Sequence, residues 1–259
     1  MPIAQLPDAH LYYELRGSAN LPVIVFSNSL GTTLEMWDPQ LAAFSAHFRI
    51  LRYDTRGHGR SSATPGDYTI EQLATDVVLL LVTLQLDRVS FCGLSMGGAT
   101  AMQLGAQAPQ RFQKLVVCNA AAKFSTNDTW QARIHSVRTG GMKAVASNVV
   151  DRWFTPSFRD AHPVETQATL AMLESASPQG YLSNCAAVRD FDFRNSLNTV
   201  RVPSLIVAGA HDPVAPPAEA RFLADHIPGA RYVELPAAHL SNIEATDDFN
   251  RQVLDFLLS

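Results

Sequence analysis

The sequence predicts an α/β fold: a mostly parallel, eight-stranded sheet with helices on both faces and an inserted helical cap. Short, continuous apolar runs, for example at residues 22–26 and 115–119, are typical of strands that are buried on both faces. Segments with helical periodicity, for example residues 70–84, alternate with these runs. Alternating strands and helices indicate a parallel sheet covered on both sides. The alternation stops between residues 123 and 190, where the sequence shows only helical patterns.

The predicted elements account for most of the chain outside that insertion. Strands are expected at residues 3–6, 10–15, 22–26, 48–53, 89–94, 115–119, 203–209 and 230–235. Helices are expected at residues 37–46, 70–84, 96–108, 217–226 and 247–258. We therefore predict one α/β core made of residues 1–122 and 191–259, and a helical cap made of residues 123–190.

Composition narrows the classes of protein and partner. The 259 residues carry a net charge of −4, which gives no reason to expect nucleic acid or an anionic membrane as a partner. Neither an apolar run long enough to span a bilayer nor a signal peptide is visible. Cys92, Cys118 and Cys185 are widely spaced and are expected to be reduced thiols in a cytoplasmic protein. The sequence does not decide between a monomer and a homodimer.

A Gly-Leu-Ser-Met-Gly motif centred on Ser95 is the strongest local signal. It follows the apolar run at residues 89–94, and a helix of small residues comes after it. In α/β hydrolases, Gly-x-Ser-x-Gly between a strand and a helix forms a sharp, strained turn that exposes the serine hydroxyl. Small neighbours are required there, and Gly93, Gly97 and Gly98 meet that requirement. The motif predicts Ser95 as a catalytic nucleophile.

Asp212 and His239 complete the predicted triad. A serine nucleophile needs a base that takes its proton and a carboxylate that holds the base in the right tautomer. In α/β hydrolases these residues follow in the order Ser, Asp, His, each just past the C-terminal end of a strand. Asp212 and His239 follow the strands predicted at residues 203–209 and 230–235. His58 stands between two glycines in a loop and is expected to have a structural role.

Two backbone N–H groups are predicted to bind an oxyanion. The first belongs to Met96, which opens the helix directly after the nucleophile. The second belongs to Leu30, in the loop at residues 27–33, where α/β hydrolases carry a His-Gly-x turn whose third residue donates its N–H. The alternative is that residues 27–33 form an ordinary connection between a strand and a helix.

The chain resembles the 3-oxoadipate enol-lactonases over essentially its whole length. The resemblance rests on the residues at 27–33 and 92–98 and, within the insertion, on the segments 152–156 and 185–190. Cap segments vary most in this superfamily, so the matches there are the most specific. The resemblance implies hydrolysis of 3-oxoadipate enol-lactone, a small anionic lactone, to 3-oxoadipate. This reaction belongs to the bacterial beta-ketoadipate pathway of aromatic degradation.

Arg133 and Trp130 are the candidate substrate-binding residues of the cap. Residues 127–138 are expected to form a helix with Asn127 or Asp128 as N-cap, Trp130 on its apolar face and Arg133 at the edge of that face. A cation in this place favours an anionic partner, because a desolvated, unpaired charge is costly. Alternatively, Arg133 extends to water or pairs with a cap carboxylate, and Trp130 only packs within the cap.

The other cap arginines and the charge of the cap complete the functional prediction. The insertion has seven basic and six acidic residues, which makes it the less acidic side of any cleft, and Arg152 and Arg189 are the next candidates for the carboxylate. The sequence thus predicts a serine hydrolase without cofactor or metal, since no histidine–carboxylate spacing suggests a metal site. The alternatives are a general carboxylesterase or perhydrolase with a similar cap, and a non-catalytic small-molecule receptor on a hydrolase scaffold.

Overall fold

A single eight-stranded sheet is the centre of the computed structural model, which describes residues 2–259. Its strands are β1 (Ile3–Gln5), β2 (His10–Arg16), β3 (Val23–Ser27), β4 (Arg49–Tyr53), β5 (Val89–Leu94), β6 (Phe112–Cys118), β7 (Ser204–Gly209) and β8 (Arg231–Leu235). Their order in the sheet is β1-β2-β4-β3-β5-β6-β7-β8. β2 runs antiparallel to both of its neighbours, and every other neighbouring pair is parallel. The predicted fold class is confirmed.

One face of the sheet is covered by α1 (Asp38–Phe44) and α11 (Thr246–Leu258), which pack against each other. Phe26 of β3 stacks on Trp37 with ring centroids 4.6 Å apart and meets the edge of Phe44 in α1. The ring of Trp37 also packs against that of Phe249 in α11, with the ring centroids 6.1 Å apart. These buried aromatic rings join the two helices to the sheet.

The opposite face is covered by α2 (Ile70–Thr83), α3 (Met96–Gln107) and α9 (Pro217–His226). Side chains alternate along a strand, so Val25 points away from the face of Phe26. Its register neighbour Phe91 and the next neighbour along, Leu115, share this second face. Gly105 of α3 lies so close to the sheet that a Cβ there would be 2.8 Å from Leu115. The small residues of α3, which begins directly after Ser95, therefore let this helix pack tightly on the central strands.

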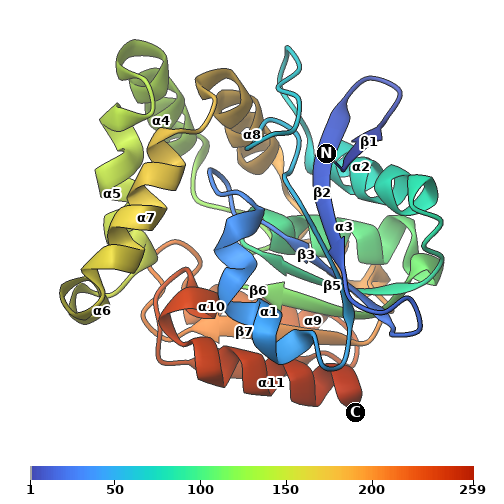
Figure 1. Cartoon of the computed structure of the whole chain (residues 1–259). Helices are drawn as coiled ribbons and strands as arrows, with labels where there is room; N and C mark the ends of the chain where they lie inside the picture. Colours follow the sequence, from blue (N-terminus) through green and yellow to red (C-terminus); the bar gives the residue numbers. More distant parts are fainter. Residues whose placement is uncertain (1) are drawn as a thin grey trace.

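Between β6 and β7 the chain forms helices only. These are α4 (Asn127–Gly140), α5 (Lys143–Trp153), α6 (Pro156–Ala161), α7 (Pro163–Glu174) and α8 (Pro178–Asp190). They lie together on one side of the molecule, apart from the helices that cover the two faces of the sheet (Figure 1). No helix within residues 2–259 combines the length and the apolar character needed to cross a bilayer.

Most helix ends lie within two residues of the sequence prediction, but the starts of α4 and α1 differ from it in kind. The N-cap of α4 is Thr126, whose hydroxyl accepts a hydrogen bond from the Thr129 N–H, so the prediction of Asn127 or Asp128 was wrong. Asp128 lies instead in the first turn, where a negative charge interacts favourably with the helix dipole. The helix predicted at residues 37–46 begins as a 3₁₀ turn over Leu34–Trp37 and continues as α1.

Candidate active site

Ser95 occupies a strained turn between β5 and α3. Its backbone has φ 58° and ψ −110°, a conformation that non-glycine residues rarely adopt. The turn is held by hydrogen bonds from Ser95 N–H to the Cys118 carbonyl (2.9 Å) and from Gly97 N–H to the Asn28 carbonyl (3.1 Å). A Cβ on Gly93 would lie 2.0 Å from the Gly97 carbonyl oxygen, so only glycine fits there. The local geometry is that of a nucleophile elbow.

The two predicted oxyanion donors lie on two segments of the chain: Met96 directly follows Ser95, and Leu30 lies in the loop after β3. Met96 is the first residue of α3, so its N–H has no partner within the helix. The N–H of Leu30 makes no hydrogen bond to any residue in the range 2–259. Asn28, at the position of the usual histidine, braces this loop, because its side chain donates to the Tyr53 carbonyl (2.9 Å) and accepts from Trp37 Nε1 (3.1 Å).

Asp212 and His239 form a buried hydrogen-bonded pair after β7 and β8. His239 Nδ1 lies 2.8 Å from Asp212 Oδ2, and both side chains are almost wholly shielded from solvent. Asp212 Oδ1 accepts the backbone N–H groups of Val214 (2.7 Å) and Ala215 (3.1 Å). Burial alone raises the pKa of Asp212, but the His239 charge and the hydrogen bonds to the carboxylate outweigh it, so the pKa is lowered. The carboxylate therefore stays ionised and fixes the imidazole.

Asn119, which the sequence did not single out, supports this pair from the position directly after β6. Its Nδ2 donates to Asp212 Oδ2 at 3.0 Å and to the Ala238 carbonyl at 3.1 Å. Its Oδ1 accepts from the Ser241 hydroxyl at 2.6 Å. Asn119 has φ 48°, a left-handed conformation that asparagine tolerates better than most residues. The only sequence signal was a polar residue directly after a buried strand, which is too common to be specific.

Glu244 joins the loop of His239 to the inserted helices. Its carboxylate accepts the N–H of Ala238 (2.8 Å) and the N–H and hydroxyl of Thr155, which follows α5. A second link runs from the Leu240 N–H to the Trp153 carbonyl at 3.0 Å. The position of His239 is therefore tied to the insertion as well as to the sheet. Nothing in the sequence pattern indicated this contact over 89 positions.

A narrow cavity brings most of the predicted site residues together. Its walls are Ser29, Leu30, Ser95, Phe124, Trp130, Arg133, Trp153, Val188, Val214 and His239. Ser95 and His239 thus share one cavity, although no hydrogen bond joins their side chains within residues 2–259. Apart from Arg133, the residues that the insertion supplies are apolar. The cavity therefore places a serine hydroxyl and a histidine beside one cation in mostly apolar surroundings.

The structure distinguishes the three candidate arginines of the insertion. The Arg133 guanidinium lies 4.8 Å from the centre of the Trp130 ring and has no ion pair with a carboxylate in residues 2–259. The Trp130 indole N–H donates to the Phe124 carbonyl at 2.9 Å, which fixes the ring. Arg189 is already paired with Asp190 and, more loosely, with an aspartate of the core. Arg152 lines a separate surface cavity. Of these three arginines, only Arg133 lines the cavity of Ser95.

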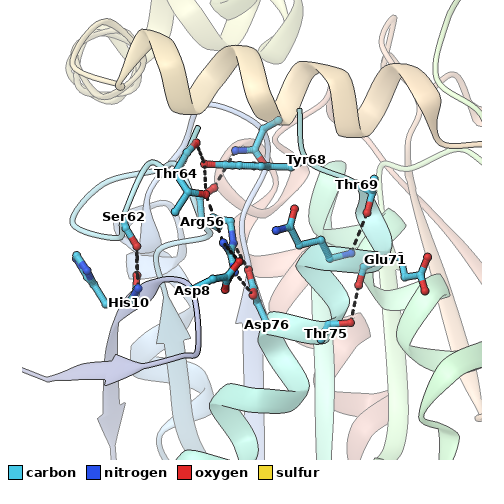
Figure 2. Close-up of polar contacts among 12 residues, drawn as sticks. Asp8, His10, Arg56, Ser62, Thr64, Tyr68, Thr69, Glu71, Thr75 and Asp76 are labelled. Carbon is cyan, nitrogen blue, oxygen red and sulfur yellow. Dashed lines mark hydrogen bonds and ion pairs between the residues drawn. The ribbon is translucent and has the colours of Figure 1, made fainter. Parts of the chain in front are cut away.

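The loop after β4 has the structural role that the sequence analysis expected. Arg56 is buried and forms ion pairs with Asp76 at 2.6 Å and Asp8 at 2.8 Å, and Figure 2 shows it between these two carboxylates. Asp54 accepts the N–H groups of Leu34 and Arg60, each at 2.9 Å. This loop is therefore fixed by internal hydrogen bonds.

Cys92 lies in β5, wholly buried, with its sulfur 3.9 Å from that of Cys118. Burial raises the pKa of the Cys92 thiol well above its ordinary value. Since a reactive cysteine needs an accessible thiolate, Cys92 is not a candidate nucleophile.

Comparisons with known proteins agree with this geometry. The model of the alpha/beta hydrolase fold family matches residues 22–152 and 169–246. A curated relative, 3-oxoadipate enol-lactonase 2 of Acinetobacter baylyi, is 42% identical over 246 residues, which are 95% of this chain and 92% of the relative. 3-Oxoadipate enol-lactonase 1 of the same organism is 39% identical over 92% of this chain and 90% of its own length.

A solved structure is similar over both full lengths. The crystal structure of the enol-lactonase from Burkholderia xenovorans LB400 superposes with a TM-score of 0.98 and is 46% identical over 100% of each chain. The similarity includes the inserted helices, where α/β hydrolases differ most.

Proposed function

Because the chain belongs to the 3-oxoadipate enol-lactonase family of α/β hydrolases, we propose that it hydrolyses 3-oxoadipate enol-lactone to 3-oxoadipate. The observation that carries this proposal is the position of Arg133. It faces the same cavity as Ser95 and His239 and has no carboxylate partner within residues 2–259. A substrate with a free carboxylate at a short distance from its ester carbonyl would supply that partner.

The reaction proceeds in two steps through an acyl-enzyme. Ser95 Oγ attacks the lactone carbonyl while His239 takes its proton, and Asp212 holds the imidazole in the reactive tautomer. The N–H groups of Leu30 and Met96 donate to the oxyanion. Collapse of this intermediate breaks the ring C–O bond, and the imidazolium protonates the departing enol oxygen, which stays attached to the acyl chain. The enol then tautomerises to a ketone.

Hydrolysis of the acyl-enzyme completes the cycle. A water molecule gives its proton to His239 and attacks the acyl carbonyl, and the same two N–H groups stabilise the second oxyanion. The Ser95 oxygen leaves with the proton from His239, which restores the free enzyme. Every proton moves among Ser95, His239, water and substrate, so no step needs another proton carrier.

Substrate recognition is assigned to the inserted helices, which act as a cap. Arg133 binds the free carboxylate, and Trp130 holds the guanidinium by a cation–π contact while its ring forms part of the apolar wall. Tyr181 of α8 is wholly buried near Arg133 and does not itself line the cavity. The Arg133 charge partly offsets the rise in the pKa of Tyr181 that burial causes, which agrees with their being close.

The state of the cysteines supports a cytoplasmic location. All three cysteines are free and buried, which suits a reducing cytoplasm, where the intermediates of aromatic breakdown are processed.

Substrate comparison with the variant Arg133→Ala tests the proposal. A lost charged hydrogen bond that leaves an anion unpaired costs about 2–5 kcal/mol, so kcat/KM for the enol-lactone should fall by roughly 30- to 5000-fold. Hydrolysis of a neutral lactone of similar size uses the same triad and should change by less than about threefold. Arg189→Ala is the matched control, since Arg189 is already paired with carboxylates, and it should leave both rates near the wild-type values.

Three outcomes would contradict the proposal. Equal losses on the two lactones would remove the carboxylate role of Arg133. Comparable kcat/KM values of the wild-type enzyme for simple neutral esters and for the enol-lactone would favour a general carboxylesterase. Covalent labelling of Ser95 without turnover of any ester would favour a receptor.

A further inference from the structure

His58 lies buried directly behind the loop that carries Leu30. The N–H of Gly31, the residue after Leu30, donates to His58 Nε2 at 2.7 Å. The side chain is only 1% exposed, and the proposed mechanism does not use it. A short hydrogen bond to the loop of a proposed oxyanion donor needs a reason beyond the filling of space.

The surroundings of His58 fix its tautomer. Since Gly31 N–H is a donor, Nε2 must carry no proton and act as the acceptor. The proton then lies on Nδ1, which faces the Arg56 carbonyl at 3.4 Å. Asn184 of α8 donates its amide to the same carbonyl at 2.8 Å. Burial lowers the pKa of His58 to about 4, so the imidazole is neutral at neutral pH and its acceptor stays available.

The loop is held on both sides of Leu30. Before it, the Ser29 carbonyl accepts from the Thr32 hydroxyl at 2.8 Å, and because the peptide is trans, the Leu30 N–H points the opposite way. After it, Gly31 has φ +85°, and a Cβ there would lie 2.4 Å from Leu173 of α7. The inserted helices thus press on Gly31 while His58 holds its N–H.

We propose that His58 is a positioning residue, which holds the Gly31 peptide so that the Leu30 N–H stays directed at the oxyanion. This inference rests on the oxyanion role given to Leu30 above. It assigns a part in transition-state binding to a loop histidine that neither contacts substrate nor transfers protons. It also connects the site to α8, because Asn184 and His58 share the Arg56 carbonyl.

The test compares two amide variants, one that can mimic Nε2 of the histidine ring and one that can mimic only Nδ1. His58→Gln can place an amide oxygen near the position of Nε2 and keep the bond to Gly31. His58→Asn reaches only the position of Nδ1 and loses that bond. Both are polar and smaller than or similar to histidine, so differences between them report on the Gly31 contact.

The readouts are steady-state kinetics and inhibitor affinity, with a simple aryl ester as substrate. Loss of an oxyanion donor costs 10²- to 10³-fold in kcat, so misdirecting one should cost roughly 10- to 100-fold. We expect His58→Asn to lose this much kcat with KM within about threefold of wild type, and His58→Gln to stay within about threefold in both. The affinity for an alkylboronic acid, whose adduct with Ser95 places an oxygen at the oxyanion position, should fall in parallel with kcat. Binding of 3-oxoadipate should not.

Equal kcat for the two variants, whether high or low, would overturn the assignment. So would equal weakening of the boronic acid and of 3-oxoadipate, because that pattern indicates general damage to the cavity. Should His58→Asn fail to fold, His58→Ala takes its place in the comparison of boronic acid and product: selective loss of the boronic acid supports the role, and wild-type affinity for both contradicts it. Because the substrate is a simple ester, a protein that cleaves it but not the enol-lactone would refute only the proposed substrate.

Discussion

Replacing Asp212 by asparagine alters one group in the site and has a result that can be worked out from the hydrogen bonds. Asp212 Oδ1 accepts two backbone N–H groups, and Oδ2 accepts from Asn119 and faces His239 Nδ1. In Asp212→Asn the amide oxygen should take the place of Oδ1, because the other orientation would oppose its NH₂ to two backbone donors. The NH₂ then faces His239 Nδ1, which must become the acceptor.

This orientation forces the proton of His239 onto Nε2, so the imidazole cannot take the proton of Ser95. In the serine protease for which such a change is known, the loss in kcat is about 10⁴-fold, which is about 5 kcal/mol of activation free energy. We expect a loss of the same order here, measured as kcat for enol-lactone hydrolysis, with an unchanged circular dichroism spectrum. A loss below tenfold in a folded variant would refute the assignment, because another carboxylate would then orient His239.

Three further predictions concern the scaffold. Gly93→Ala should yield inactive or unfolded protein, because its Cβ would lie 2.0 Å from a backbone oxygen of the elbow; wild-type kcat would contradict the elbow geometry. Burial lowers the pKa of His58 from 6.5 to about 4, so the unfolded chain binds more protons in this interval. The free energy of unfolding should therefore fall by roughly 3 kcal/mol from pH 6.5 to pH 4 through this group. Urea titrations should show a shallower fall for His58→Gln, and an identical slope would exclude this origin. Asp76→Ala leaves the buried Arg56 charge without its main partner and should cost about 3–5 kcal/mol of unfolding free energy. Asp8→Ala removes an exposed partner of Arg56 and should cost less than about 1 kcal/mol. Equal costs of the two variants in urea unfolding would contradict this prediction.

The fold and the proposed triad could be predicted from the sequence because their signals are local. An apolar run followed by small residues defines both β5 and the elbow around Ser95, and the order of Asp212 and His239 after successive strands follows from chain topology. The strained φ of Ser95 and the contacts of the elbow glycines are the structural counterparts of that pattern.

The supporting contacts could not be predicted, because they depend on residues that are far apart in sequence. Asn119 bonds to Asp212 over 93 positions, and Glu244 reaches Thr155 over 89. An asparagine after a strand or a glutamate in a helix is common, so neither position is distinctive. The prediction of the N-cap of α4 failed for another reason. Several residues that make good N-caps follow one another there, and local preference does not rank them.

The most direct test of the account is the loss of ultraviolet absorbance of freshly generated 3-oxoadipate enol-lactone with wild-type enzyme and with Ser95→Ala. Removal of a serine nucleophile lowers kcat by about 10⁶-fold in a known hydrolase. We predict rapid loss of the lactone with the wild type and a kcat lower by about 10⁶-fold with folded Ser95→Ala. Wild-type-like hydrolysis by Ser95→Ala, or no hydrolysis by the wild-type enzyme, would contradict the account.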